Sequence, residues 1–136
     1  MKKILIATDG SPASREAIEL GLELAEEQAA EVTFLHVVPV HRIDDVDRKP
    51  LDVALALADE RSLDAKAELL VGVIADEIVA YADTVDADLV VLGSGGRSAI
   101  ATALLGSVSR GVLHEARRPV LLVPGAHVHE PEPAGS

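Results

Sequence analysis

Short runs of aliphatic and β-branched residues recur along the chain, and each is bounded by Asp, Gly or Pro. Four of these runs are strong, at residues 3–8, 32–38, 88–93 and 119–123. A weaker run at 67–72, "AELLVG", lies between the second and the third. Short apolar runs with such boundaries are typical of buried strands, so the pattern predicts five strands.

Between these runs, apolar residues recur at the spacing of helices. The first helix is predicted to begin after Ser11, which can cap it, with Pro12 in the first helical position. Its apolar residues are Ile18, Leu22, Ala25 and Ala29, and its glutamates fall largely on the other side. Further helices are predicted at 50–65, at 75–85 and from Val108 to Ala116.

Strands and helices therefore alternate along the chain. This order predicts an α/β fold, with a parallel sheet that carries helices on both faces. The pattern ends near residue 124, so we expect one domain over 1–124 and a disordered tail over 125–136. The polar stretch at 41–49 is expected to be a loop.

Composition supports this fold class and excludes several kinds of site. Hydrophobic residues make up 49% of the 136 residues but aromatic residues only 1%, so the core has to be aliphatic. An aliphatic core suits parallel strands that are buried on both faces. The chain has no cysteine, which excludes disulfides and thiolate chemistry. Its five histidines lack the spacing of a zinc site, and no G-x-S-x-G elbow indicates a serine hydrolase.

The charge balance bears on partners and location. The formal net charge is −11, and such a surface repels nucleic acids and anionic membranes. The apolar run after the first residues is too short for a secretory signal, and no later stretch approaches a membrane span. We therefore expect a cytoplasmic protein that binds neither nucleic acid nor membrane.

Two polar, glycine-containing segments follow predicted strands, "ATDGS" after the first and "GSGGRS" at the end of 88–93. Ligands of open parallel sheets bind beyond the carboxyl ends of the strands. Gly93, Gly95 and Gly96 permit positive φ and let backbone N–H groups approach a ligand. A strand-to-helix turn without any ligand explains "GSGG" alone equally well.

A helix that starts at Gly106 and Ser107 exposes unpaired N–H donors, which favour phosphate. The hydroxyls of Ser107 and Ser109 can add donors, and Arg97 can meet a phosphate with two hydrogen bonds. These features predict an anion site at the end of the run 88–93, if the glycines serve more than a turn.

The spacing of the glycines is more specific than their number. Gly93, Gly96 and Gly106-Ser107 follow the pattern G-x2-G-x9-G-(S/T). This pattern, together with "KKILIATDGSPASREAIELGLELA", "VTFLHVV" and "LLGSVSRGVLHEARRPVLLVP", resembles the ATP-binding branch of the universal stress protein family. The resemblance covers nearly the whole chain.

The resemblance implies a three-layer fold of the adenine nucleotide alpha hydrolase-like kind, with a five-stranded parallel sheet of order 3-2-1-4-5 and four flanking helices. It also implies ATP as the ligand, with AMP as a possible alternative and Mg²⁺ bound along with the nucleotide. The binding positions that it implies, together with Arg97 from the reasoning above, are Ala7, Thr8, Asp9, Val37, Leu92, Gly93, Gly96, Arg97, Gly106, Ser107, Val108 and Ser109.

Some features depart from the family or leave alternatives open. Gly95 stands where the family often has His, and the stretch before the weak run is shorter than usual, so that edge strand is expected to be truncated. Asp9 is either a partner of the ribose or a residue that ends the first strand and helps to cap the next helix, and the two roles are compatible.

Three functions are compatible with these residues: an ATP-binding regulatory module of the stress response, a slow ATPase, and a nucleotide-free scaffold. The lysine of the G-x-x-x-x-G-K-(S/T) motif is missing, so efficient phosphoryl transfer is not expected and no catalytic residue is predicted. The module is expected to act on a protein partner. An unpaired edge strand at Pro119 to Val123 would invite pairing with a second copy, and the resemblance implies a homodimer at this strand.

Overall fold

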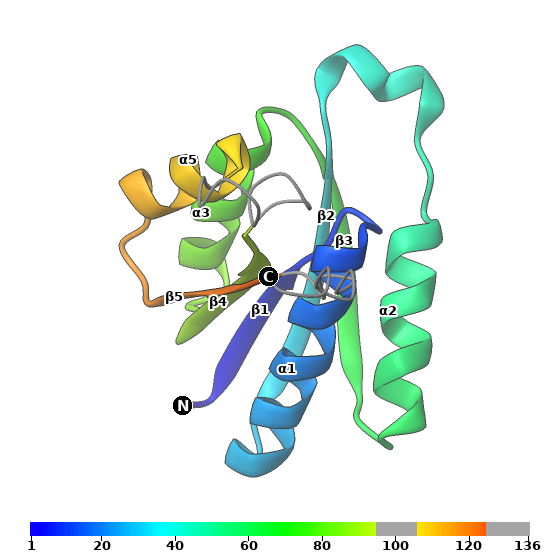
Figure 1. Ribbon diagram of the computed structural model, residues 1–136, viewed down its shortest axis with the longest axis vertical. Helices are drawn as coiled ribbons and strands as arrows, with labels where there is room; N and C mark the ends of the chain where they lie inside the picture. The colour runs from blue at the N-terminus through cyan, green and yellow to red at the C-terminus, as the bar shows by residue number, and fades with distance from the viewer. Residues whose placement is uncertain (95–105, 125–136) are drawn as a thin grey trace, which may run out of the picture.

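The computed structural model describes residues 1–94 and 106–124 of the chain. Five strands, four α-helices and one 3₁₀ segment lie within these residues (Figure 1). The strands are β1 (Lys3–Ala7), β2 (Glu31–Val38), β3 (Ala65–Val71), β4 (Leu89–Gly93) and β5 (Val120–Val123). The helices are α1 (Pro12–Gln28), α2 (Lys49–Glu60), α3 (Ile74–Thr84) and α5 (Ser107–Glu115), and the 3₁₀ segment η1 is Val40–Asp45.

The strands form one parallel sheet, as the sequence pattern predicted, and its order β3-β2-β1-β4-β5 is the one that the family resemblance implied. β1 is central and pairs with β2 on one side and with β4 on the other. The loop that follows β1 and the end of β4 therefore lie side by side at the carboxyl edge of the sheet. β3 and β5 are the two edges of the sheet.

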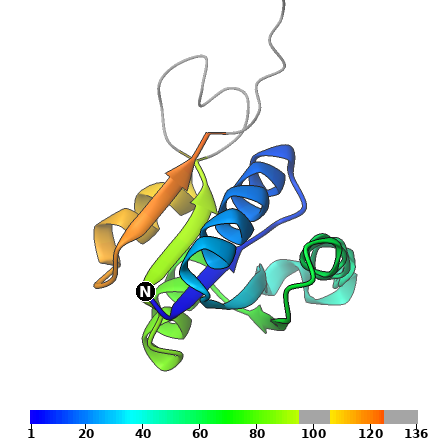
Figure 2. The same ribbon diagram turned by 90° about the horizontal axis from the view of Figure 1, so that it is seen from below.

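Side chains of each central strand alternate between two apolar layers. On one face, Ile4 and Ile6 of β1 pack with Phe34 and with α1 and α2. On the other face, Leu5 and Ala7 pack with α3 and α5. Figures 1 and 2 show these two pairs of helices on opposite sides of the sheet. The sequence explains this arrangement, because strands buried on both faces require apolar residues at consecutive positions.

The first helix begins as predicted. Ser11 is its N-cap, the Ser11 hydroxyl accepts the Ser14 N–H, and Pro12 occupies the first turn. The helix ends at Gln28, because Ala29 takes a left-handed conformation with φ 52°. No helix among the described residues combines the length and the apolar character needed to cross a bilayer.

Three expectations for the region between β2 and β3 were wrong. Residues 40–45 form 3₁₀ turns where a loop was expected. α2 ends at Glu60, well short of residue 65, because the chain turns through Ser62 at φ 58°. β3 is not truncated: it pairs with β2 at every position from Ala65 to Val71. The early end of α2 leaves enough chain for a full edge strand.

Candidate functional site

The loop between β1 and α1 is held by hydrogen bonds from its own side chains. Oδ1 of Asp9 accepts the Ser11 N–H at 2.8 Å and the Ser14 hydroxyl at 2.6 Å. The Ser14 oxygen accepts the Asp9 N–H at 3.1 Å, and the Thr8 hydroxyl oxygen accepts the Gly10 N–H at 3.2 Å. These bonds close a tight turn in which Gly10 has φ 83°, a conformation that favours glycine.

Neighbouring strand β2 fixes the start of this loop. The Thr8 N–H donates to the Leu35 carbonyl at 2.9 Å, and Nδ1 of His36 lies 2.9 Å from the Thr8 carbonyl oxygen. Since a carbonyl can only accept, Nδ1 of His36 carries the proton in this bond. His36 is half-buried and satisfied within the fold, so its role here is structural.

Asp9 fulfils the structural role that the sequence left open, because it follows β1 and ties the turn that leads into α1. Partial burial of its carboxylate raises its pKa, but hydrogen bonds from Ser11 and Ser14 lower the pKa by more. The net pKa lies below the ordinary value for aspartate, so Asp9 carries a full negative charge at neutral pH. None of the hydrogen bonds among the described residues uses its second oxygen, Oδ2.

The end of β4 approaches α1 so closely that only glycine fits. A Cβ built on Gly93 would lie 2.8 Å from the carbonyl carbon of Ala13 and 2.9 Å from its oxygen. The sequence predicted that Gly93 permits a positive φ and lets the backbone approach a ligand, and the positive φ was wrong. Gly93 keeps the extended backbone of β4, and its value is the missing side chain.

The start of α5 lies against the same end of β4. The buried Ser109 hydroxyl donates to the Gly93 carbonyl at 3.0 Å, and the Gly106 N–H donates to the Ser94 carbonyl at 3.1 Å. Both donors were expected to face a ligand, but each donates to a carbonyl of the fold instead. The first bond within the helix runs from the Arg110 N–H to the Gly106 carbonyl. The N–H groups of residues 107–109 precede it and have no acceptor within the helix.

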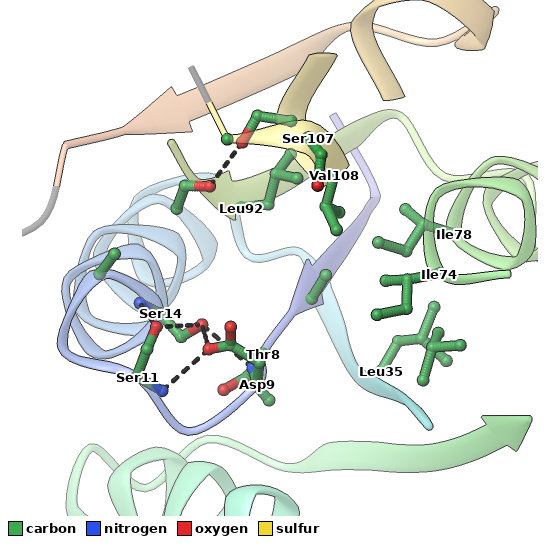
Figure 3. A pocket seen from close by; sticks show the side chains of 16 residues that line it. Thr8, Asp9, Ser11, Ser14, Leu35, Ile74, Ile78, Leu92, Ser107 and Val108 are labelled. Carbon is green, nitrogen blue, oxygen red and sulfur yellow. Dashed lines mark hydrogen bonds between the residues drawn. The ribbon is translucent and has the colours of Figure 1, made fainter. Parts of the chain in front are cut away.

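These two regions form the walls of one cavity of about 400 Å³ (Figure 3). All the predicted binding positions line it except Gly96 and Arg97, which lie outside the described residues. The lining positions that the sequence predicted are Ala7, Thr8, Asp9, Val37, Leu92, Gly93, Gly106, Ser107, Val108 and Ser109. The fold thus gathers residues from four separate stretches of the chain.

Six further residues line the cavity and were not predicted: Ser11, Ala13, Ser14, Leu35, Ile74 and Ile78. Two sequence signals could have found some of them. Leu35 lies two positions before Val37, so it faces the same side of β2. Ile74 and Ile78 are four apart and share one side of α3. For Ala13, the fit against Gly93 depends on the tertiary structure alone.

The cavity has two chemically different sides. Figure 3 shows Leu35, Ile74 and Ile78 on one side and the hydroxyls and carboxylate of Thr8, Asp9, Ser11 and Ser14 on the other. The start of α5, with Ser107 and Val108, borders the space between them. Such a site suits a ligand with a flat apolar part, hydroxyl groups and an anionic end. Among residues 1–94 and 106–124, no three His, Asp or Glu side chains gather as metal ligands would.

Comparisons with known proteins agree with this architecture. The sequence profile described as the universal stress protein family matches residues 1–124. A universal stress protein of Methanocaldococcus jannaschii is 35% identical over 138 residues, which cover 90% of this chain and 81% of that protein. The structure of the universal stress protein from Archaeoglobus fulgidus in complex with dAMP is 27% identical with a TM-score of 0.75, over 90% of this chain and 98% of that one. A universal stress protein in complex with cAMP is 28% identical with a TM-score of 0.70, over 90% of this chain and 96% of that one.

Proposed function

Because the chain belongs to the universal stress protein family, we propose that its cavity binds an adenine nucleotide, with ATP as the ligand and AMP as the alternative. In this proposal the protein is a regulatory module of the stress response, whose surface for a protein partner depends on the bound nucleotide. It acts in the cytoplasm as a homodimer that pairs through β5, an edge strand of the sheet.

The observation that carries the proposal is the division of the cavity into an aliphatic side and a polar side. The base would lie against Leu35, Val37 and Ile78, where aliphatic side chains cover its faces. Oδ2 of Asp9 would accept a ribose hydroxyl, because Oδ1 is already used within the loop. Support also comes from two structural relatives whose bound ligands are adenine nucleotides.

The phosphates would meet the N–H groups at the start of α5, where the helix dipole favours negative charge. Among the described residues, Asp9 is the carboxylate that lines the cavity, and this proposal assigns its free oxygen to the ribose. Mg²⁺ is therefore proposed to enter with the nucleotide, because this ion keeps most of its water and binds chiefly to phosphates in nucleotide sites. Arg97 is proposed to add a positive charge at the phosphates.

Equilibrium titration with ATP, AMP and GTP in the presence of Mg²⁺ tests the proposal. Gly106→Val should abolish binding, because its side chain would occupy the place of the phosphates. Ser107→Ala is the matched control: it keeps the backbone N–H and removes only a hydroxyl, so affinity should fall by less than about tenfold, the worth of one neutral hydrogen bond. Absence of ATP binding to the wild type at millimolar concentration would refute the proposal.

Mass spectrometry of gently purified protein offers a second test, because a good site retains its nucleotide. Arg97→Ala should weaken binding more at low salt than at high salt, since salt screens the interaction between charges. Unchanged affinity at low salt would remove Arg97 from the site. Any ATP turnover should be far slower than the roughly 1–100 per second of kinases, because the phosphate-binding lysine is missing.

A further inference from the structure

A second cavity, of about 540 Å³, lies between the first turns of α1 and α2. Thr8, Asp9 and Ser11 of the loop between β1 and α1 line both this cavity and the first one, so the loop is the wall between them. The two cavities share no other lining residue among those that the structure describes. Cavities of roughly 300–1,000 Å³ are typical of small-molecule sites, so the second cavity has room for a ligand of its own.

Both helices present the same two kinds of side chain to this second cavity. On α1, Pro12, Arg15 and Ile18 line it at intervals of three residues, which places them on one side of the helix. On α2, Lys49 and Val53 line it four residues apart, again on one side. The cavity therefore lies between two helix surfaces, each with one basic and one aliphatic side chain.

The second cavity has an apolar floor and is closed at one end. Ile18 is 2% exposed and belongs to the same apolar layer as Leu51 of α2. A Cβ built on Gly10 would lie 3.2 Å from Cγ of Pro50, so the loop after β1 lies directly against the first turn of α2. Val53 is 39% exposed and leaves an aliphatic surface open to a ligand. The space is thus framed by the fold itself and needs no rearrangement to accept a small molecule.

The two basic side chains of the second cavity have no acidic partner within the described part of the chain. Arg61 and Arg118 form ion pairs with carboxylates of neighbouring elements. Arg15 and Lys49 form none with residues 1–94 or 106–124, although the chain carries a net charge of −11. Arginine binds carboxylates and phosphates with two parallel hydrogen bonds, and lysine binds them as a point charge. These two side chains therefore suit an anionic group that a ligand brings to the cavity.

The two carboxylates of the lining are used within the turns that they belong to. Oδ1 of Asp9 accepts the Ser11 N–H, and Oδ1 of Asp47 accepts the Lys49 N–H at 2.9 Å. Each carboxylate thus stabilises the start of a helix, and neither pairs with Arg15 or Lys49. Their charges still lower the positive potential of the cavity, so an anionic group alone would bind weakly. A ligand therefore needs an apolar part as well, which the aliphatic side chains would cover.

We propose that the second cavity binds a small organic anion, whose carboxylate or phosphate lies between Arg15 and Lys49 and whose aliphatic part lies over Ile18 and Val53. Burial of apolar surface supplies affinity, and the two cations select an anion over a neutral molecule of the same shape. This ligand is separate from the nucleotide, whose phosphates are proposed to lie at the start of α5 in the first cavity. The inference therefore does not depend on nucleotide binding.

Amide chemical shifts in NMR titrations test the proposal with three six-carbon probes: hexanoate, hexyl phosphate and hexan-1-ol. At least one of the anions should shift the amides of Gly10, Arg15 and Val53 in a saturable way, and the tighter of the two identifies the preferred group. Hexan-1-ol should bind at least about tenfold more weakly, because it lacks hydrogen bonds between charged groups. The proposal is overturned if neither anion binds at these residues, or if hexan-1-ol binds as tightly as the tighter anion.

Removal of either positive charge tests the role of the two cations. Arg15→Gln and Lys49→Gln should each weaken binding of the tighter anion by about tenfold or more, the worth of a charge-assisted hydrogen bond. Lys66→Gln is the matched control, since it removes one exposed charge near the amino end of β3 and does not line the cavity. All three side chains are exposed, so the variants should fold normally. Equal affinities of the three variants for the anion would overturn the proposal.

Titration of the same variants with ATP separates this ligand from the nucleotide. Arg15→Gln and Lys49→Gln should bind ATP with an affinity close to that of the wild type. If both lose ATP affinity as strongly as they lose the anion, the two cations bind nucleotide phosphates and a separate ligand is refuted. If the wild type binds hexanoate or hexyl phosphate in the second cavity but no ATP, the nucleotide proposal fails and this one holds.

Discussion

On the α1 side of the cavity, side-chain hydrogen bonds hold the loop between β1 and α1 in place. On the α5 side, the missing side chain of Gly93 allows β4 and α1 to meet. Thr8, Asp9, Ser11 and Ser14 fix the first wall through bonds of 2.6–3.2 Å. The second wall depends on Gly93, whose absent Cβ lets β4 touch the backbone of α1.

The difference shows two ways to make a preorganised site. Hydrogen-bonded side chains can be weakened one at a time, because each replaced group removes one or two bonds. A close contact between two backbones cannot be weakened in such steps. Even the smallest added side chain meets backbone atoms, which can move only together with their whole helix or strand. We therefore expect the second wall to tolerate substitution less than the first.

The largest effect is expected from Gly93→Ala. Its Cβ would lie below 3 Å from Ala13 backbone atoms, so α1 and β4 have to separate, which costs about 1–3 kcal/mol as for other overpacked cores. Gly21→Ala is the comparison: its Cβ would lie 2.5 Å from Cδ1 and 2.9 Å from Cγ1 of the buried Ile6, so it meets a side chain and no backbone atom, and alanine also favours the helix. Urea unfolding should show a clearly larger loss for Gly93→Ala. Equal losses of stability would mean that the contact between β4 and α1 does not depend on Gly93.

The next effect compares one hydroxyl from each wall. Ser14→Ala leaves the Asp9 N–H without its acceptor and removes one of the two donors to Oδ1 of Asp9, and we expect about 1–3 kcal/mol of lost stability. Ser109→Ala removes only the bond to the Gly93 carbonyl, worth about 1 kcal/mol. Unfolding curves of both variants measure the difference. A larger loss for Ser109→Ala would contradict the view that Ser14 is the centre of the first wall.

A smaller effect concerns acid pH. The pKa of Asp9 is lower in the folded state than the value of about 3.9 in unfolded chains. At a pH between these two pKa values, the unfolded state therefore binds more protons than the folded state. The stability from Asp9 is therefore fully present above about pH 4 and is lost as the pH falls through the folded pKa. Asp9→Asn should flatten the decline in stability between pH 5 and pH 3. Asp59→Asn, an exposed substitution on α2, controls for the loss of one charge.

The smallest effect is expected far from both walls. Arg61 forms an ion pair with Glu26 between the ends of α1 and α2, and both side chains are partly exposed. Exposed ion pairs contribute roughly 0–1 kcal/mol, so Arg61→Ala should change stability little and nucleotide affinity not at all. A change in nucleotide affinity would show that this ion pair at the far ends of the helices affects the cavity.

Several features of the fold follow from local sequence. Ser11-Pro12 marks the start of α1 because the cap and the missing N–H act within one turn. The apolar runs mark the central strands because burial on both faces favours apolar residues at consecutive positions. The end of α2 was misjudged, because residues 61–65 contain no glycine or proline that would mark an end, and the left-handed Ser62 gives no signal of its own.

By itself, the sequence determined the alternation of strands and helices and which segments reach the carboxyl edge of the sheet, because these depend on periodicity and on glycine and proline chemistry. Only the tertiary structure decided how individual atoms are used there. Gly93 matters for a contact with Ala13, which is distant in sequence, and the hydroxyl of Ser109 is taken by a strand carbonyl. Contacts between distant segments depend on packing in three dimensions, which no local pattern of residues encodes.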